Sequence, residues 1–311
     1  MFWLSLVGVG SQKPGTNWDR LRPSFTAVCK GRHIGQPYHT LGAVKIDNVS
    51  QHVPCKDRFI QNYQYLHLTS LASSSLPTDV WLPSSDIVQP QFGRQLSLGY
   101  YKNLKKNTYE TSVEIYYKTM ENLVEYSEGY MPGVSIGLEN IDNNLTFGDG
   151  QSYGLELFIA KRTGALNGWM GYTLSKTTRQ FDELNQGRWY YAKYDRPHDI
   201  SVVLNYQFSK RLNLSTVFVY ASGNSLTVPK SVYVIDGNLI TEWGDRNNYR
   251  MAPYHRADLA LTLKNKDTKK YKSSWTLSIY NIYNRQNPYF IYFETDGRLG
   301  GNEAVEIKAQ Q

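Results

Sequence analysis

Two short strings combine the side chains that catalysis and metal binding use most often. Residues 194–199 read YDRPHD and residues 254–258 read YHRAD, so each string gathers Tyr, Arg, His and Asp. Imidazole and carboxylate groups this close together could act as acid and base or ligate a metal ion. Neither spacing matches a known nucleophile–base or metal motif. We therefore interpret both strings as strand entries, in which Arg and Asp pair between adjacent strands at a polar rim.

The rest of the chain adds no catalytic constellation. It contains no Gly-rich phosphate loop, no Gly-x-Ser-x-Gly elbow and no His-Glu-x-x-His, and its carboxylates are dispersed. The two cysteines, Cys29 and Cys55, make neither a metal quartet nor a disulfide framework, and they could pair only with each other. We predict that the protein is not an enzyme, with no catalytic residue, no metal site and no cofactor.

Aromatic side chains gather in one long connection, residues 178–197. Trp189, Tyr190, Tyr191 and Tyr194 lie there within six positions. Aromatic rings with a polar tip suit ligand contact, and they suit anchoring at the boundary between lipid and water equally well. We take these four residues as the candidates for ligand binding.

The elements that must position these residues are strands. Residues 198–208 and 212–220 alternate apolar and polar side chains, and residues 209–211 (SKR) form the tight turn between them. A period of two gives each strand one apolar and one mostly polar face. Each strand has roughly ten residues, which is the length that crosses a bilayer at a tilt of about 45°.

Composition fits a protein that crosses a membrane with strands. The chain has 311 residues, a mean hydropathy of -0.51 and 25 tyrosines. It has no run of about 18 apolar residues that could form a membrane-spanning helix, whereas a barrel strand turns only every second residue to lipid. The net charge is +7, and basic residues cluster in the turns 102–106 and 264–270 without a nucleic-acid signature. We expect no nucleic-acid partner.

The connections between expected strands alternate in length. Long connections at 120–149, 178–197 and 222–253 are separated by short turns at 103–107, 162–165, 209–211 and 264–270. Up-and-down outer-membrane barrels have short periplasmic turns and long outer loops. We therefore predict an all-β fold, an antiparallel up-and-down transmembrane β-barrel that residues 61–311 form only in part, with about ten strands. The alternative is a soluble antiparallel sheet or sandwich.

Residues 1–60 show no sustained period, and we expect an irregular segment there. The opening MFWLSLVGVG lacks the basic region and the cleavage site of a secretory signal. The lack of a secretory signal indicates either a cytoplasmic protein or a sequence without its original N-terminus.

From residue 62 to the end, the sequence resembles the C-terminal barrel portion of a TonB-dependent outer-membrane receptor of the Bacteroidetes type. Six strings in order carry the resemblance: 62–68 (NYQYLHL), 81–84 (WLPS), 171–176 (GYTLSK), 194–201 (YDRPHDIS), 254–259 (YHRADL) and 280–289 (YNIYNRQNPY).

The resemblance implies a larger barrel of about twenty-two strands around an N-terminal plug, working with the TonB complex in energised uptake of siderophores, vitamin B12, glycans or peptides. Plug, TonB-binding segment and closing strand find no match here, so we expect a truncated or frame-shifted product in the cell outer membrane. It would contact outer-membrane lipid and transport nothing alone. The second hypothesis is a soluble β-domain that binds a glycan or a protein through its aromatic loops.

Overall fold

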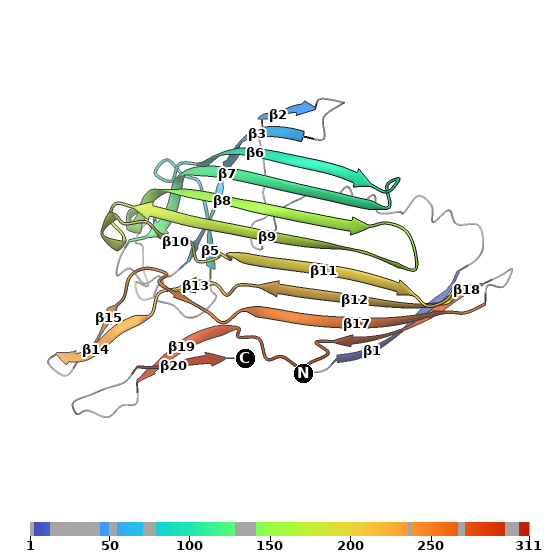
Figure 1. Cartoon of the computed structure of the whole chain (residues 1–311). Helices are drawn as coiled ribbons and strands as arrows, with labels where there is room; N and C mark the ends of the chain where they lie inside the picture. Colours follow the sequence, from blue (N-terminus) through green and yellow to red (C-terminus); the bar gives the residue numbers. More distant parts are fainter. Residues whose placement is uncertain are drawn as a thin grey trace.

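The protein is a curved antiparallel β-sheet, with smaller hairpins at one end (Figure 1). The computed structural model describes residues 3–12, 44–49, 55–70, 79–127, 141–235, 238–266, 271–295 and 305–310. The strands of the large sheet are β1 (Trp3–Gln12), β2 (Val44–Val49), β3 (Cys55–Gln64), β6 (Gln91–Leu104), β7 (Tyr109–Tyr126), β8 (Leu145–Lys161), β9 (Leu166–Phe181), β10 (Tyr190–Tyr191), β11 (His198–Gln207), β12 (Leu212–Ala221), β17 (Tyr254–Lys264) and β18 (Lys272–Tyr280).

The remaining strands pair two by two outside that sheet. They are β4 (Leu66–Ser70) with β5 (Asp79–Pro83), β13 (Ser225–Leu226) with β16 (Tyr249–Arg250), β14 (Pro229–Ile235) with β15 (Asn238–Trp243), and β19 (Phe290–Thr295) with β20 (Val305–Gln310). Two short 3₁₀ helices, η2 (Ile141–Asn144) and η3 (Asn185–Gly187), lie in the long connections. Within the described residues, no helix is long and apolar enough to cross a membrane.

The predicted fold class is confirmed. The described strands form a 12-stranded sheet in the order β1-β18-β17-β12-β11-β9-β8-β7-β6-β3-β2, with β10 paired to β9, and neighbours are antiparallel throughout. The predicted hairpin is β11–β12, whose register runs from Asp199↔Ala221 to Gln207↔Asn213. Short turns join strands at one end of the sheet, and long connections join them at the other (Figure 1). We call these the turn end and the loop end.

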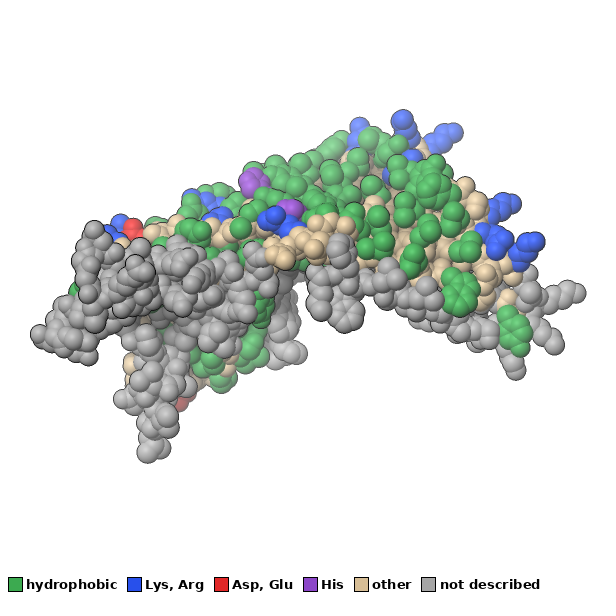
Figure 2. All heavy atoms as spheres, turned by 90° about the horizontal axis from the view of Figure 1, so that it is seen from below, with side chains coloured by type: hydrophobic (Ala, Val, Ile, Leu, Met, Phe, Trp, Pro, Cys, Tyr) green, Lys and Arg blue, Asp and Glu red, His purple; other side chains and the backbone are tan. Residues whose placement is uncertain are grey.

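The two faces of the sheet differ in polarity. One face carries large apolar side chains that remain exposed, among them Leu96, Leu98, Ile115, Leu157, Met170, Leu204 and Leu261. Figure 2 shows hydrophobic side chains covering much of a broad surface. The opposite face carries polar side chains such as Asn205, whose amide oxygen accepts a 2.7 Å hydrogen bond from Ser215 on the neighbouring strand. The two are named the apolar face and the polar face below.

Buried apolar side chains concentrate at the loop end rather than along the sheet. Two clusters form there. One joins Leu82, Val88, Val124, Tyr126 and Leu145, and the other joins Met120, Leu123, Phe181, Leu184 and Tyr190. The loops and the ends of the long strands therefore pack together into a cap at the loop end.

Several expected boundaries are wrong. β7 continues to Tyr126 and β8 begins at Leu145, so the connection expected at 120–149 is shorter, and β9 continues to Phe181. The connection 222–253 contains the hairpin strands β13 to β16. The segment 1–60, expected to be irregular, contributes β1 and β2 to the sheet, because the backbones of β18 and β3 supply partners that a sequence pattern does not reveal. Whether it forms a separate domain stays a prediction.

Candidate ligand pocket at the loop end

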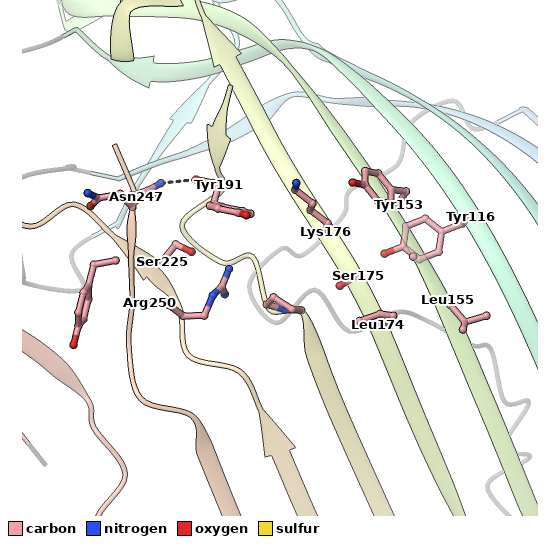
Figure 3. A pocket seen from close by; sticks show the side chains of 14 residues that line it. Tyr116, Tyr153, Leu155, Leu174, Ser175, Lys176, Tyr191, Ser225, Asn247 and Arg250 are labelled. Carbon is pink, nitrogen blue, oxygen red and sulfur yellow. Dashed lines mark hydrogen bonds between the residues drawn. The ribbon is translucent and has the colours of Figure 1, made fainter. Parts of the chain in front are cut away.

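A pocket of about 620 Å³ opens where the loop-end connections meet strands β7 to β9 (Figure 3). Its strand side is formed by residues of β7, β8 and β9, including Tyr116, Gly154 and Ser175. Its loop side comes from Tyr191 of β10 and from the connection after β12. The loop-side lining includes Tyr191, Ser225, Asn247, Asn248, Tyr249 and Arg250.

Close packing of the polar face shapes the strand wall. A Cβ atom at Gly154 would lie 2.7 Å from the carbonyl oxygen of Leu174 and 2.9 Å from the ring of Tyr116. Glycine is therefore required for the Tyr116 ring to lie against the sheet. This close approach places an aromatic surface beside the pocket.

A buried ion pair anchors the loop wall. The Asp195 side chain has no exposed surface, and one of its carboxylate oxygens lies 2.6 Å from the Arg250 guanidinium. The other oxygen accepts a 2.6 Å hydrogen bond from the backbone N–H of Thr177 on β9. Arg250 also donates to the carbonyl oxygens of Asp195 and Gly223 at 2.6 and 2.9 Å. The guanidinium therefore ties two loops to a strand.

A second charge network lies behind this wall. The buried carboxylate of Glu125 bridges Arg179 at 2.6 Å and Arg246 at 2.9 Å. The Arg246 guanidinium stacks 5.6 Å from the ring centre of Tyr190. Burial raises the pKa of the Tyr190 phenol well above its usual value, and the negative charge of Glu125 raises it further. Tyr190 therefore stays neutral at physiological pH.

The four predicted aromatic residues fall into separate environments. Tyr191 lines the pocket, and Lys176 and Arg250 lie 5.4 and 5.5 Å from its ring centre. Trp189 and Tyr194 are exposed outside the pocket lining, and the Lys193 ammonium lies over the Tyr194 ring. Tyr190 is only 4% exposed and belongs to the buried cluster of Phe181 and Leu184.

Hydrogen bonds hold the pocket's loop wall in place. Asn247 donates from its side chain to the carbonyl of Tyr191 at 2.7 Å, as the dashed line in Figure 3 marks. Its backbone N–H donates to the Thr227 hydroxyl at 3.0 Å. The backbone N–H of Ser225 donates to the carbonyl of Lys193, also at 3.0 Å. A ligand would meet a wall that is already ordered.

The two Tyr-Arg-His-Asp strings are strand entries, but their pairing differs from the prediction. Arg256 pairs with Asp258 on its own strand at 3.0 Å, while Asp195 pairs with Arg250 of the next long connection. The histidines take equivalent roles, since His198 and His255 each share a 2.9 Å hydrogen bond with a tyrosine hydroxyl. Among the described residues, no group of His, Cys, Asp and Glu is arranged to hold a metal ion.

The sequence did not reveal Asn247 or Arg250 as pocket residues. Both lie in a connection of mixed composition, far along the chain from Tyr191. One signal in the sequence was Asp195, which lies just before a strand. A carboxylate that is buried there needs a cationic partner, although the sequence does not say which residue supplies it.

Solved structures with a similar fold are receptors and a transporter for iron. The pyoverdine receptor FpvA of Pseudomonas aeruginosa, in a complex with a heterologous iron-loaded pyoverdine, matches 81% of this chain with a TM-score of 0.50 and 13% identity. The chain shares with this receptor the fold of a partial antiparallel β-barrel. The ferric-catecholate import receptor Fiu of E. coli K12 matches 78% at a TM-score of 0.49 and 14% identity, and the iron transporter FrpB of Neisseria meningitidis matches 80% at 0.48 and 14%.

The chain spans about a third of the length of these receptors, with 29% of FpvA, 30% of Fiu and 35% of FrpB covered. No family model matches the sequence, and no curated protein matches it.

Proposed function

We propose that the chain is part of a TonB-dependent outer-membrane receptor for energised nutrient uptake, resident in the cell outer membrane. The observation that carries this proposal is the pair of unlike faces on one sheet. Exposed leucines cover one face, and hydrogen-bonded polar side chains cover the other. Strands of an outer-membrane barrel have such faces, because alternate side chains meet lipid and a polar lumen.

The loop end is the proposed ligand side. Tyr191 offers a ring inside the pocket, and Trp189 and Tyr194 offer exposed rings beside it. Tyr190 supports them from the buried cluster rather than touching ligand. The connections 182–197 and 222–253 would then face the cell exterior, and ligand would enter a lumen lined by the polar face.

Energised uptake through this receptor would depend on partner proteins. A plug domain and the TonB complex belong to the receptor that the six sequence strings indicate, of the Bacteroidetes type, with this chain as its C-terminal part. The match to 29% of the length of FpvA supports a partial barrel. We therefore propose that the chain is not competent for transport alone.

Detergent dependence tests the proposal. The purified chain should be monodisperse only in detergent micelles or bilayers, because the apolar face needs a lipid-like cover. Size-exclusion chromatography with light scattering, with and without detergent, measures this directly. A monodisperse species without detergent would favour the second candidate, a soluble domain that binds a glycan or protein through exposed rings such as Trp189, which is 45% exposed.

A further inference from the structure

Exposed cations gather at the turn end of the sheet. Three of the short turns and their flanks carry Lys105 and Lys106, Lys210 and Arg211, and Lys264 and Lys266, all exposed. These six residues are named the basic collar. Within the described residues none of the six has an acidic partner. A fourth turn differs, because Arg162 pairs there with Glu110.

The loop end carries more ion pairs. Several of its cations pair with acids, as in Arg246 with Glu125 and Arg250 with Asp195, although the exposed Lys176 has no acidic partner among the described residues. In Figure 2 the Lys and Arg side chains at the turn end stand without a red neighbour, whereas blue and red lie together at the loop end. Exposed cations without an acidic partner are therefore concentrated at the turn end.

Turn geometry does not explain the lysines. Lys105 and Lys106 both adopt a left-handed backbone, with φ of 47° and 52°. Glycine or asparagine takes this conformation at lower cost, so a turn selected for geometry alone would favour them. Arg211 is fixed by a 2.7 Å hydrogen bond from its Nε to the carbonyl of Lys264, which links two turns of the collar.

An apolar border separates the collar from the middle of the apolar face. Tyr206 and Phe208 stack edge to face with their ring centres 4.7 Å apart, and they are 42% and 56% exposed. Trp275 on β18 is 51% exposed near the same end. Toward the turn end, the side chains along the strands change from aliphatic to aromatic to cationic. A bilayer leaflet changes in the same order, from acyl chains through the interface to the phosphate groups.

We propose that the basic collar binds the phosphate groups of anionic glycerophospholipids in the leaflet on the turn side. This rests on the proposed membrane location of the sheet. Flexible lysine stems reach from the aromatic border to headgroup depth, and the ion pairs of the loop end leave a weaker attraction for anionic lipid there. The collar would fix the direction and depth of the sheet in the membrane.

The test compares binding of the full-length chain, diluted from urea, to two kinds of vesicle. One is made of phosphatidylcholine alone, and the other is phosphatidylcholine mixed with phosphatidylglycerol. Flotation over a range of lipid concentrations gives a partition coefficient for each. The collar variant is Lys105→Gln with Lys210→Gln. The matched control is Lys193→Gln with Lys230→Gln, two lysines of the loop end.

Wild type should bind anionic vesicles more tightly than neutral ones, and each neutralised collar residue should lower that preference about fivefold. The control variant should keep the preference, and added salt should remove it. Equal partitioning of wild type into both vesicles would overturn the proposed lipid binding by the collar. An equal loss of the preference for anionic vesicles in the collar and control variants would do the same. Either result would leave the proposed membrane location unaffected. Failure to bind either vesicle would contradict the proposed function and the collar that rests on it.

Discussion

The buried carboxylate of Asp195 lies 2.6 Å from the guanidinium of Arg250, a residue 55 positions later in the sequence. The same carboxylate accepts a hydrogen bond from the backbone of Thr177. One side chain thus joins strand β9 to both long connections of the pocket.

Removing the cation of this pair should destabilise the loop end. Arg250→Ala leaves a buried carboxylate without its partner, which costs about 3–5 kcal/mol. Urea unfolding in detergent micelles measures the loss. The control is Arg188→Ala, which breaks the exposed pair of Arg188 with Asp245, with side chains 55% and 60% exposed, and should change stability by less than about 1 kcal/mol. Equal effects of the two variants would contradict a structural role for the buried pair.

Two glycines of the polar face should respond differently to the same substitution. Gly154→Ala brings its methyl group against the Leu174 carbonyl and the Tyr116 ring, and overpacking of this kind costs about 1–3 kcal/mol. At Gly171 the nearest atom to a new Cβ is 3.8 Å away in Trp169, so Gly171→Ala should be near neutral. Unfolding of both variants in the same detergent decides the matter, and a neutral Gly154→Ala would mean that the Tyr116 ring does not rest on residue 154.

The assignment of faces can be tested with two adjacent residues. Leu204 is 38% exposed on the apolar face, while Asn205 is held on the polar face by Ser215. Arginine on the lipid side costs about 2–4 kcal/mol near the bilayer midplane. Leu204→Arg should therefore lower the yield of folded protein in bilayers well below that of Asn205→Arg. Similar yields would argue against a membrane-spanning sheet.

The buried phenol of Tyr190 should make stability fall in alkali. Its pKa is higher in the folded chain than the value of about 10 in an unfolded one, so the folded state holds this proton more tightly. Its contribution is therefore complete below pH ~10 and is lost as the pH rises above that value, by up to about 1.4 kcal/mol per pH unit. Tyr190→Phe should flatten the decline of unfolding free energy measured between pH ~10 and ~12. An unchanged slope would show that the phenol is not buried as described.

Alternation of apolar and polar residues made the hairpin β11–β12 predictable nearly to the residue, because the side chains of its two faces differ in polarity. The same rule failed beyond Met120. There the register shifts between Met120 and Leu123, and Asn122 adopts a φ of 59°, so the pattern breaks although the strand continues to Tyr126. Both faces are also buried at that end by the loop cap, which removes the polar half of the signal.

The candidate site was predictable only in part. Tyr191, which lines the pocket, stands out in the sequence because aromatic residues cluster near it. Contacts such as Glu125 with Arg246 join residues 121 positions apart, and no local pattern encodes them. Sequence patterns report which face a side chain takes, whereas the pocket depends on how separate loops meet.

The last prediction is that the chain alone forms no working pore. In lipid every backbone N–H and C=O needs a partner, so a spanning sheet must close on itself. Among the described strands the sheet runs from β2 to β1, and these two do not pair. Each outer edge would present unpaired backbone groups and act as a template for aggregation.

Closure into a narrower barrel meets a second obstacle on the polar face. Glu114 and Glu156 are direct cross-strand neighbours there, and a small lumen would have to bury both carboxylates at a substantial free-energy cost. The chain should therefore be exported behind a signal peptide, and the outer-membrane fraction assayed for heat-modifiable mobility and single-channel conductance. We expect degraded or aggregated protein without conductance. A stable, heat-modifiable and conducting species would show instead that these strands close into a functional barrel by themselves.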